Sequence, residues 1–100
     1  METNLKGRVV LISGAAKGIG RATAVAFAKE GCRLALVDID KDDLGSLVKE
    51  IKALGCEAEI GIGDLSTAEG VSKSIAQATK KYGGNVDVLV NNVGSGYVRT

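Results

Sequence analysis

The feature that most constrains this chain is a glycine-rich run that directly follows an apolar stretch. Residues Val9–Ile12 are all apolar, and the segment after them contains Gly14, Gly18 and Gly20. The residues beyond these glycines show the periodicity of a helix. A strand, a glycine-rich turn and a helix N-terminus, in this order, present free backbone N–H groups to a phosphate. The sequence therefore predicts a site for a phosphate-bearing nucleotide at this turn.

Each glycine of the run has its own expected task. Gly14 permits a tight turn after the strand, Gly18 lets the backbone approach a pyrophosphate, and Gly20 lets the helix lie close to the sheet. The N–H groups of residues 17–20, aided by the helix dipole, are expected to hold the diphosphate. The alternative is a plain glycine turn without a ligand. The residues that we predict to bind the cofactor here are Gly14, Ala16, Lys17, Gly18, Ile19 and Gly20.

An acidic residue ends the next apolar run. Asp38 follows Leu34–Val37 and lies twenty residues after Gly18, the spacing at which a carboxylate can bind the ribose hydroxyls of a dinucleotide. Its charge would repel a 2′-phosphate, which favours NAD over NADP. Lys17 favours the opposite, because an ammonium in the turn could bind that phosphate, but Ile39 adds no second positive charge. We therefore predict NAD as the cofactor, with NADP as the less favoured one.

Strands and helices are predicted to alternate along the whole chain. The expected strands span 8–12, 33–38, 57–62 and 86–90, and the expected helices span 17–29, 42–54 and a third segment that ends at Gly83-Gly84. This alternation implies a parallel sheet with right-handed crossovers. The predicted fold is α/β, a doubly wound parallel sheet in the order 3-2-1-4. Ligands in such sheets bind at the carboxyl ends of the strands, beside the point where the strand order reverses.

Two details of the helices are also predicted. The first helix is expected to bury Ile19, Thr23, Ala26 and Phe27, which recur at helical spacing, while its alanines allow close packing on the sheet. The segment Ser66-Thr67-Ala68-Glu69 is expected to form a capping box at the start of the third helix.

Polar residues follow the third and fourth strands at the same end of the predicted sheet. Asp64 could accept a hydrogen bond from an adenine amino group, or it could help to cap the next helix. Asn91 and Asn92 could join the fourth strand to its neighbours, and Gly94 could let the backbone lie against a ribose. Ordinary turn chemistry would also account for asparagine and glycine here. What favours a binding site is that these residues converge with the glycine turn and Asp38.

Composition narrows the classes of function. Thirteen basic and 12 acidic residues give a net charge of +1, which provides no electrostatic basis for binding nucleic acid or an anionic membrane. The chain has no apolar run of membrane-spanning length and no signal peptide, so a cytoplasmic protein is expected. Without histidine, and with only Cys32 and Cys56, no metal site is expected. The two cysteines are expected to be free thiols, with a disulfide as the alternative.

Together these residues resemble the N-terminal half of a classical short-chain dehydrogenase/reductase. The Thr-Gly-x-x-x-Gly-Ile-Gly turn of that family appears at 13–20 with serine in place of threonine, and its Asn-Asn-Ala-Gly appears at 91–94 with valine in place of alanine. The resemblance covers residues 5–96. It implies a partial Rossmann-type fold and hydride transfer between a nicotinamide cofactor and an alcohol or carbonyl substrate. By the same resemblance, Asp38, Asp64, Leu65, Asn92 and Gly94 are expected to bind the cofactor.

The catalytic residues of that family have no counterpart in this sequence. The family uses a tyrosine, a lysine four residues later and a serine, whereas Tyr82 has Val86 at the lysine position and Tyr97 is followed by only three residues. We assign no catalytic residue, and expect the 100 residues to be the front part of one domain, inactive alone. A truncated, non-catalytic dinucleotide-binding module is the alternative, and an unrelated glycine-turn fold such as a methyltransferase is a third. A homo-oligomer is possible by resemblance.

Overall fold

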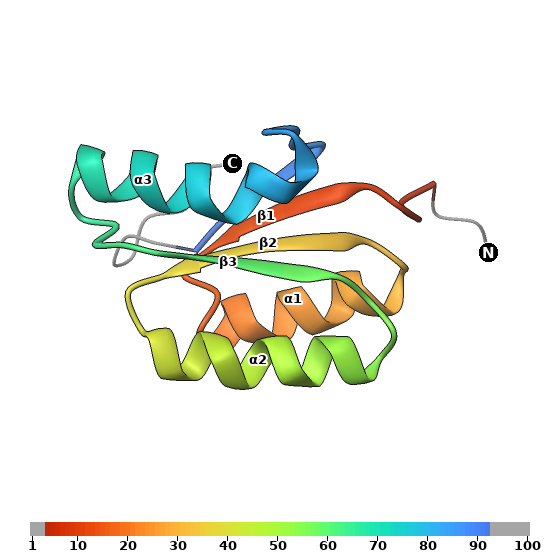
Figure 1. The fold of residues 1–100 in the computed structure, drawn as a ribbon. Helices are drawn as coiled ribbons and strands as arrows, with labels where there is room; N and C mark the ends of the chain where they lie inside the picture. Colours follow the sequence, from red (N-terminus) through yellow and green to blue (C-terminus); the bar gives the residue numbers. More distant parts are fainter. Residues whose placement is uncertain (1–3, 93–100) are drawn as a thin grey trace.

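A four-stranded sheet carries helices on both faces in the computed structural model, which describes residues 4–92 (Figure 1). In chain order the elements are β1 (Val9–Ser13), α1 (Gly18–Lys29), β2 (Arg33–Asp38), α2 (Lys41–Ala53), β3 (Ala58–Ile62), α3 (Ala68–Thr79), the short 3-10 helix η1 (Lys80–Tyr82) and β4 (Val88–Asn91). The predicted elements are therefore all present, with ends that shift by one or two residues.

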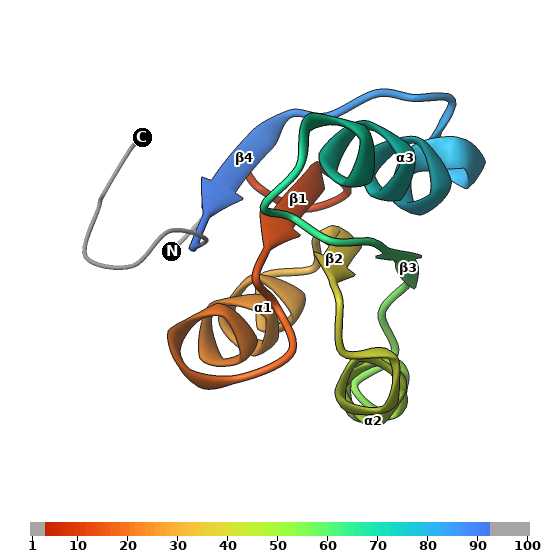
Figure 2. The same cartoon turned by 90° about the vertical axis from the view of Figure 1, so that its left-hand side faces the viewer.

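The strands are parallel and lie in the order β3-β2-β1-β4, as predicted. Leu11 of β1 is in register with Ala35 of β2 on one side and with Leu89 of β4 on the other. Helices α1 and α2 cover one face of the sheet, and α3 covers the other (Figure 2). The fold is thus a partial Rossmann fold, and the order reverses between β1 and β4, where a ligand is expected.

Two apolar clusters hold the layers together. The larger lies between the sheet and the helices α1 and α2, and the smaller lies under α3 and η1. Because β1 and β2 supply side chains to both clusters, they are buried on both faces, as central parallel strands are. The residues of α2 that are fully buried are Leu44, Leu47 and Ile51, as its periodicity predicts.

The predicted apolar face of α1 is wrong, whereas the predicted close packing of its alanines on the sheet is confirmed at Ala24 and Ala28. The buried residues of this helix are Gly20, Ala24 and Ala28, whereas Ile19 is 77% exposed and Ala26 is also exposed. Thr23 and Phe27 are partly buried. The helix faces the sheet with its smallest side chains because close approach of the two backbones leaves no room for larger ones. The glycine turn at its N-terminus sets that approach.

The predicted capping box of α3 is also wrong in detail. The N-cap is Thr67, whose hydroxyl accepts a hydrogen bond from the N–H of Gly70 at 2.9 Å. Ser66 lies one residue earlier and donates to Asp64 instead. The other end of this region agrees with the sequence, since Gly83 ends η1 in the left-handed conformation, with φ of +69°.

Tyr82 provides a test of packing on the α3 face. Its hydroxyl donates to the carbonyl of Leu34 at 2.9 Å, and burial raises its pKa to about 12. The unfolded chain loses the phenol proton near its ordinary pKa of about 10, so stability should fall as the pH rises from about 10 to 12. We expect Tyr82→Phe to cost about 1 kcal/mol at neutral pH and to flatten this alkaline decline. Urea unfolding across the pH range measures both effects, and an unchanged decline would contradict this assignment.

β4 lies at one edge of the described sheet and carries an exposed apolar side chain. Leu89 is 62% exposed, and an apolar strand edge favours association with another chain. We expect the 100-residue chain to self-associate and Leu89→Lys to increase the monomer fraction in size-exclusion chromatography. Leu54→Lys is the control, because Leu54 is 44% exposed at the end of α2, away from the edge. A stable monomer of the unsubstituted chain would contradict the expectation.

Cys32 and Cys56 are free thiols, the first buried and the second partly buried, as expected. None of the helices in residues 4–92 has the length and apolar character that a membrane span requires.

Candidate functional site

The glycine turn connects the end of β1 to the start of α1. Gly14 and Gly18 have φ of +68° and +59°, in the left-handed region that residues with a Cβ rarely adopt. The N–H of Gly14 donates to the carbonyl of Val37 at 2.9 Å, which ties the turn to β2. A Cβ added at Gly20 would overlap the carbonyl oxygen of Gly14. All three predicted glycines therefore have a conformational or steric reason to be glycine.

The N-terminus of α1 differs from those of α2 and α3. Asp40 caps α2 and Thr67 caps α3 through side-chain oxygens, whereas the N-cap of α1, Lys17, makes no side-chain capping hydrogen bond. An added Cβ at Gly18 would meet no atom within 4 Å, so the backbone there is open to approach. The first turn of α1 can thus offer its N–H groups and the positive end of its dipole to an anion.

Asp38 lies at the end of β2 with its carboxylate beside the glycine turn. One oxygen, Oδ2, accepts a hydrogen bond from the N–H of Ala16 at 3.0 Å, and Oδ1 accepts one from the N–H of Asp40 at 3.1 Å. A carboxylate has about four lone-pair positions, so these two bonds leave capacity for the hydroxyls of a ribose. The acidic residue and the glycine turn, twenty-two residues apart at this contact, are therefore brought together as the sequence predicts.

A surface hollow of about 240 Å³ brings together residues from three strand ends. It is lined by Gly14, Asp38, Ile39, Leu65 and Asn92, four of which the sequence singles out as cofactor-binding residues. Ile39 lies directly after Asp38 and also lines this hollow, which the sequence does not predict.

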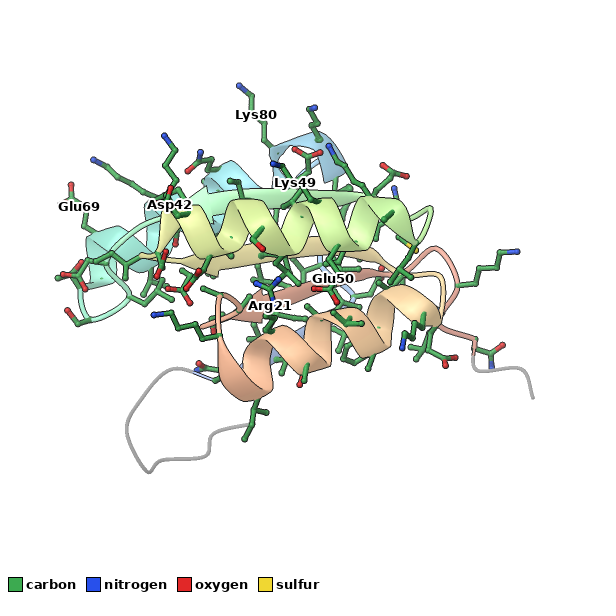
Figure 3. All side chains as sticks on the ribbon, turned by 90° about the horizontal axis from the view of Figure 1, so that it is seen from below. Arg21, Asp42, Lys49, Glu50, Glu69 and Lys80 are labelled. Carbon is green, nitrogen blue, oxygen red and sulfur yellow. The ribbon has the colours of Figure 1, made fainter. Side chains whose placement is uncertain are left out.

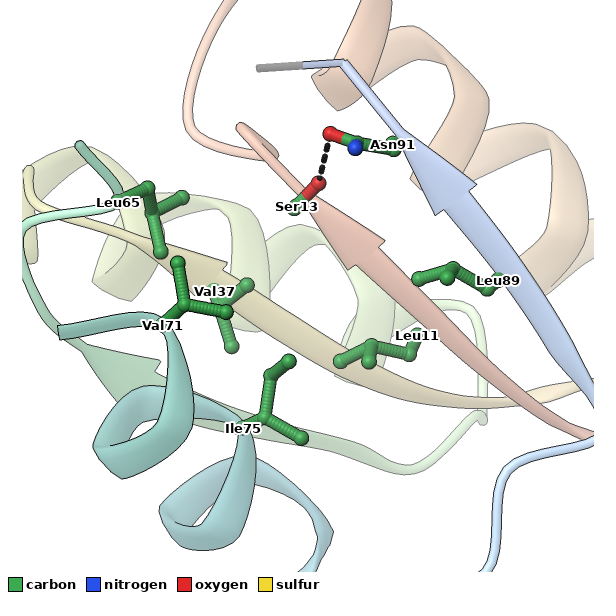
Figure 4. Close-up of a pocket in the computed structure, with 8 residues that line it drawn as sticks. All are labelled: Leu11, Ser13, Val37, Leu65, Val71, Ile75, Leu89 and Asn91. Atoms are coloured by element: carbon green, nitrogen blue, oxygen red, sulfur yellow. Dashed lines mark hydrogen bonds between the residues drawn. The ribbon is translucent and has the colours of Figure 1, made fainter. Parts of the chain in front are cut away.

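An apolar pocket of about 210 Å³ lies between α3 and the sheet (Figure 4). Its lining comes from β1, β2, β4, α3 and the turn before α3: Leu11, Ser13, Val37, Leu65, Val71, Ile75, Leu89 and Asn91. At its rim the hydroxyl of Ser13 donates to Oδ1 of Asn91 at 2.8 Å, which joins β4 to β1 as predicted for Asn91. Leu65 lines both this pocket and the hollow beside Asp38.

Asp64 follows β3, and its contacts favour a local role. Its Oδ1 accepts hydrogen bonds from the hydroxyl of Ser66 at 2.6 Å and from the N–H of Ser66 at 2.9 Å. These bonds, the hydroxyl one first, hold the pKa of Asp64 below its ordinary value. The turn before α3 is thus closed by Asp64, while its contact with an adenine stays a prediction. Gly94, the last predicted binding residue, lies outside the described residues.

Sequence reasoning missed Arg21, which joins the glycine turn to α2. Its guanidinium donates to the carbonyls of Ala16 at 3.4 Å and Asp43 at 3.2 Å, and it also contacts Ser46 and Glu50. Figure 3 shows Arg21 and Glu50 pointing toward each other between the two helices. The only signal in the sequence is a long cation on the helix that follows the turn, and helices carry such residues for many reasons.

The position of Lys17 in the glycine turn suggests that it binds a 2′-phosphate, but its ammonium lies at the start of α2. Its ammonium lies 3.5 Å from a carboxylate oxygen of Asp40 and 3.5 Å from one of Asp43, both at the start of α2. These carboxylates, that of Asp43 first, raise the pKa of Lys17.

Comparison with known proteins agrees with this geometry. A family model described as short chain dehydrogenase matches residues 8–100. The chain belongs to the short-chain dehydrogenase family. The resemblance found in the glycine turn and the Asn-Asn-Val-Gly segment is thereby confirmed, and with it an oxidoreductase family with a Rossmann-type nucleotide-binding fold.

Three similar proteins illustrate how this chain compares with members of the family. A 3-oxoacyl-[acyl-carrier-protein] reductase of Thermotoga maritima is 41% identical over 90 residues, which cover 90% of this chain and 36% of the relative. L-Sorbose reductase of Gluconobacter frateurii, solved with NADPH and L-sorbose, superposes with a TM-score of 0.87 at 34% identity, over 100% of this chain and 38% of that one. NAD⁺-bound xylitol dehydrogenase superposes with a TM-score of 0.84 at 32% identity, over 92% and 35%.

The short-chain dehydrogenase chain described here spans little more than a third of the length of these relatives. The similarity therefore concerns the part of the family that carries the glycine turn and the strands β1 to β4.

Proposed function

We propose that this chain binds NAD at the glycine turn and forms the cofactor-binding part of an oxidoreductase. The full reaction would transfer a hydride between the nicotinamide and an alcohol or carbonyl of a small molecule. The observation that carries the proposal is the carboxylate of Asp38 hydrogen-bonded to the N–H of Ala16, directly beside the uncapped N-terminus of α1. The N-terminus of α1 would thus bind the diphosphate, and Asp38 at the end of β2 would bind the ribose.

Six of the predicted residues have a defined task in this proposal. Backbone N–H groups of Gly18, Ile19 and Gly20 would hold the diphosphate, because no side chain caps the helix there. The free acceptor capacity of Asp38 would bind the hydroxyls of the adenosine ribose. Leu65 and Asn92, which line the hollow with Asp38, would border the adenosine.

The same carboxylate supports NAD rather than NADP. A 2′-phosphate bound in this position would lie against the negative charge of Asp38, which a 2′-hydroxyl would not. The family includes both preferences, since L-sorbose reductase was solved with NADPH and xylitol dehydrogenase with NAD⁺. The choice therefore rests on the residues of this chain.

Within residues 4–92, the tyrosine of this chain is part of the core and not of the site. Tyr82 donates its hydroxyl proton to Leu34, and its pKa of about 12 is unsuited to proton exchange near neutral pH. When bound, a nicotinamide cofactor supplies or accepts the hydride. The described residues would bind and orient it, and we assign none of them a proton-transfer step.

Calorimetric titration of the chain with NADH and with NADPH tests the proposal. We expect saturable heat for NADH with weaker binding of NADPH, together with shifts of the backbone amide resonances of residues 15–20 and 38–40. No heat from either dinucleotide, or amide shifts confined to other regions, would overturn it.

A further inference from the structure

The side chain of Lys17 bridges from the glycine turn to the first turn of α2. Its ammonium is 3.5 Å from Oδ2 of Asp40 and 3.5 Å from Oδ2 of Asp43. One positive and two negative charges leave this group with a net charge of −1. The only cation of the glycine turn is therefore already neutralised by residues that lie outside the turn.

The two carboxylates are held in place by contacts of their own. Asp40 is the N-cap of α2, and its Oδ1 accepts the N–H of Asp43 at 3.0 Å, which leaves Oδ2 for Lys17. The backbone at Asp43 is fixed by Arg21, whose guanidinium donates to the carbonyl of Asp43 at 3.2 Å and to that of Ala16 at 3.4 Å. The start of α2 is thus fastened to the glycine turn, and the acidic pair is positioned before any ligand binds.

We propose that Asp40 and Asp43 are specificity-determining residues that hold the Lys17 ammonium at α2, so that it does not serve a 2′-phosphate. This inference rests on the proposed dinucleotide function and deepens it. A lysine in the turn would otherwise favour NADP and would oppose the selection by Asp38. Because Asp40 and Asp43 hold the ammonium of Lys17, the site distinguishes NAD from NADP as it would if the glycine turn contained no lysine.

Simple electrostatics gives the expected size of the effect. An ammonium about 4 Å from a phosphate dianion in water raises a binding constant by a factor of about thirty. Ordering of the long side chain and screening by salt reduce this factor to about ten. The ion pairs of Lys17 are exposed, with its side chain 73% accessible, so releasing it needs no change in the fold.

The test replaces both carboxylates in the double variant Asp40→Asn/Asp43→Asn. Asparagine is an N-cap as good as aspartate, so α2 should keep its start while the charges are removed. We expect the ratio of NADPH affinity to NADH affinity to rise about tenfold, by calorimetry at low salt. NADH affinity itself should change less than about twofold, which also reports that the variant is folded. Asp43→Asn alone leaves the cap untouched and should produce part of the rise.

Two further variants separate release of Lys17 from a general loss of negative charge. Asp42→Asn removes a carboxylate from the same turn of α2 (Figure 3) that is not among the partners of Lys17, and should change the ratio by about threefold or less. When Lys17→Met is added to the double variant, we expect the ratio of NADPH affinity to NADH affinity to rise no more than it does in Asp42→Asn.

The outcomes distinguish this inference from the proposed function. The inference alone is overturned if NADH binds to the wild-type chain but the double variant keeps the wild-type ratio, or if the full gain persists without Lys17. In the second case the acids repel the phosphate directly. Absence of binding of both dinucleotides to the wild-type chain overturns the inference and the proposed function together.

Discussion

Gly20→Ala is expected to destabilise the chain by about 3 kcal/mol or more and to abolish NADH binding. The new Cβ would overlap the carbonyl oxygen of Gly14 and come within 2.9 Å of its carbonyl carbon and 3.1 Å of the Cα of Ala15. All three are backbone atoms of the glycine turn, so no side-chain rotation can relieve the contact. Either the turn or the whole of α1 must move, and both movements separate Ala16 from Asp38.

Gly45→Ala is the matched control for this substitution. Gly45 lies inside α2, and a Cβ added there would meet no atom within 4 Å. Alanine should therefore stabilise the chain by about 1 kcal/mol through helix propensity alone. Urea unfolding of both variants, followed by NADH titration of whatever remains folded, measures the contrast. A Gly20→Ala chain with wild-type stability would show that the turn is not closed against α1.

The order of the sheet could be predicted because each strand has a strong local signal. Val9–Ile12 and Leu34–Val37 are continuous apolar runs, which are typical of parallel strands covered on both faces, and Gly31 and Gly55 separate helices from the strands that follow. Once the strands alternate with helices, right-handed crossovers leave few arrangements. The meeting of Asp38 with the glycine turn then follows from the topology.

Details that depend on close backbone approach could not be predicted from hydrophobicity. The sequence pattern favours burial of Ile19, but α1 lies so near the sheet that Gly20, Ala24 and Ala28 face it instead. The same effect appears on the other face, where a Cβ at Gly61 of β3 would overlap the carbonyl oxygen of Ser74 in α3. In α1 the glycine and alanines do predict the close contact, whereas apolar periodicity selects the wrong face.

Side-chain contacts between elements were the second class of feature that the sequence left open. Lys17 alone suggests a phosphate ligand, and its pairing with Asp40 and Asp43 depends on how α1 and α2 lie against each other. The same holds for Arg21, whose partners lie up to 29 residues away along the chain. Motifs fix the backbone of this site, whereas tertiary packing decides which charges remain available to a ligand.

The second large effect is expected at Asp38, where Asp38→Ala should weaken NADH binding at least about tenfold, because hydrogen bonds to a charged group contribute about 1.5–3 kcal/mol. Binding of NADPH should weaken less or even improve, because the repulsion of the 2′-phosphate is lost as well. The substitution also removes the acceptor of the Ala16 N–H, and Ala16 is only 2% exposed. A destabilisation of about 1–3 kcal/mol should accompany the change in affinity.

Asp87→Ala separates the loss of stability from the loss of a ligand contact. The carboxylate of Asp87 likewise accepts a backbone N–H, that of Val9 at 2.8 Å, but at the opposite end of β1 from the glycine turn. The substitution at Asp87 should lower the stability of the chain and leave the ratio of the affinities for NADH and NADPH unchanged. If Asp38→Ala and Asp87→Ala shift the two affinities alike, Asp38 acts only through the fold. A change in selectivity confined to Asp38 means that its carboxylate acts on the 2′ position of the ribose, because a loss of stability alone would weaken the binding of both dinucleotides alike.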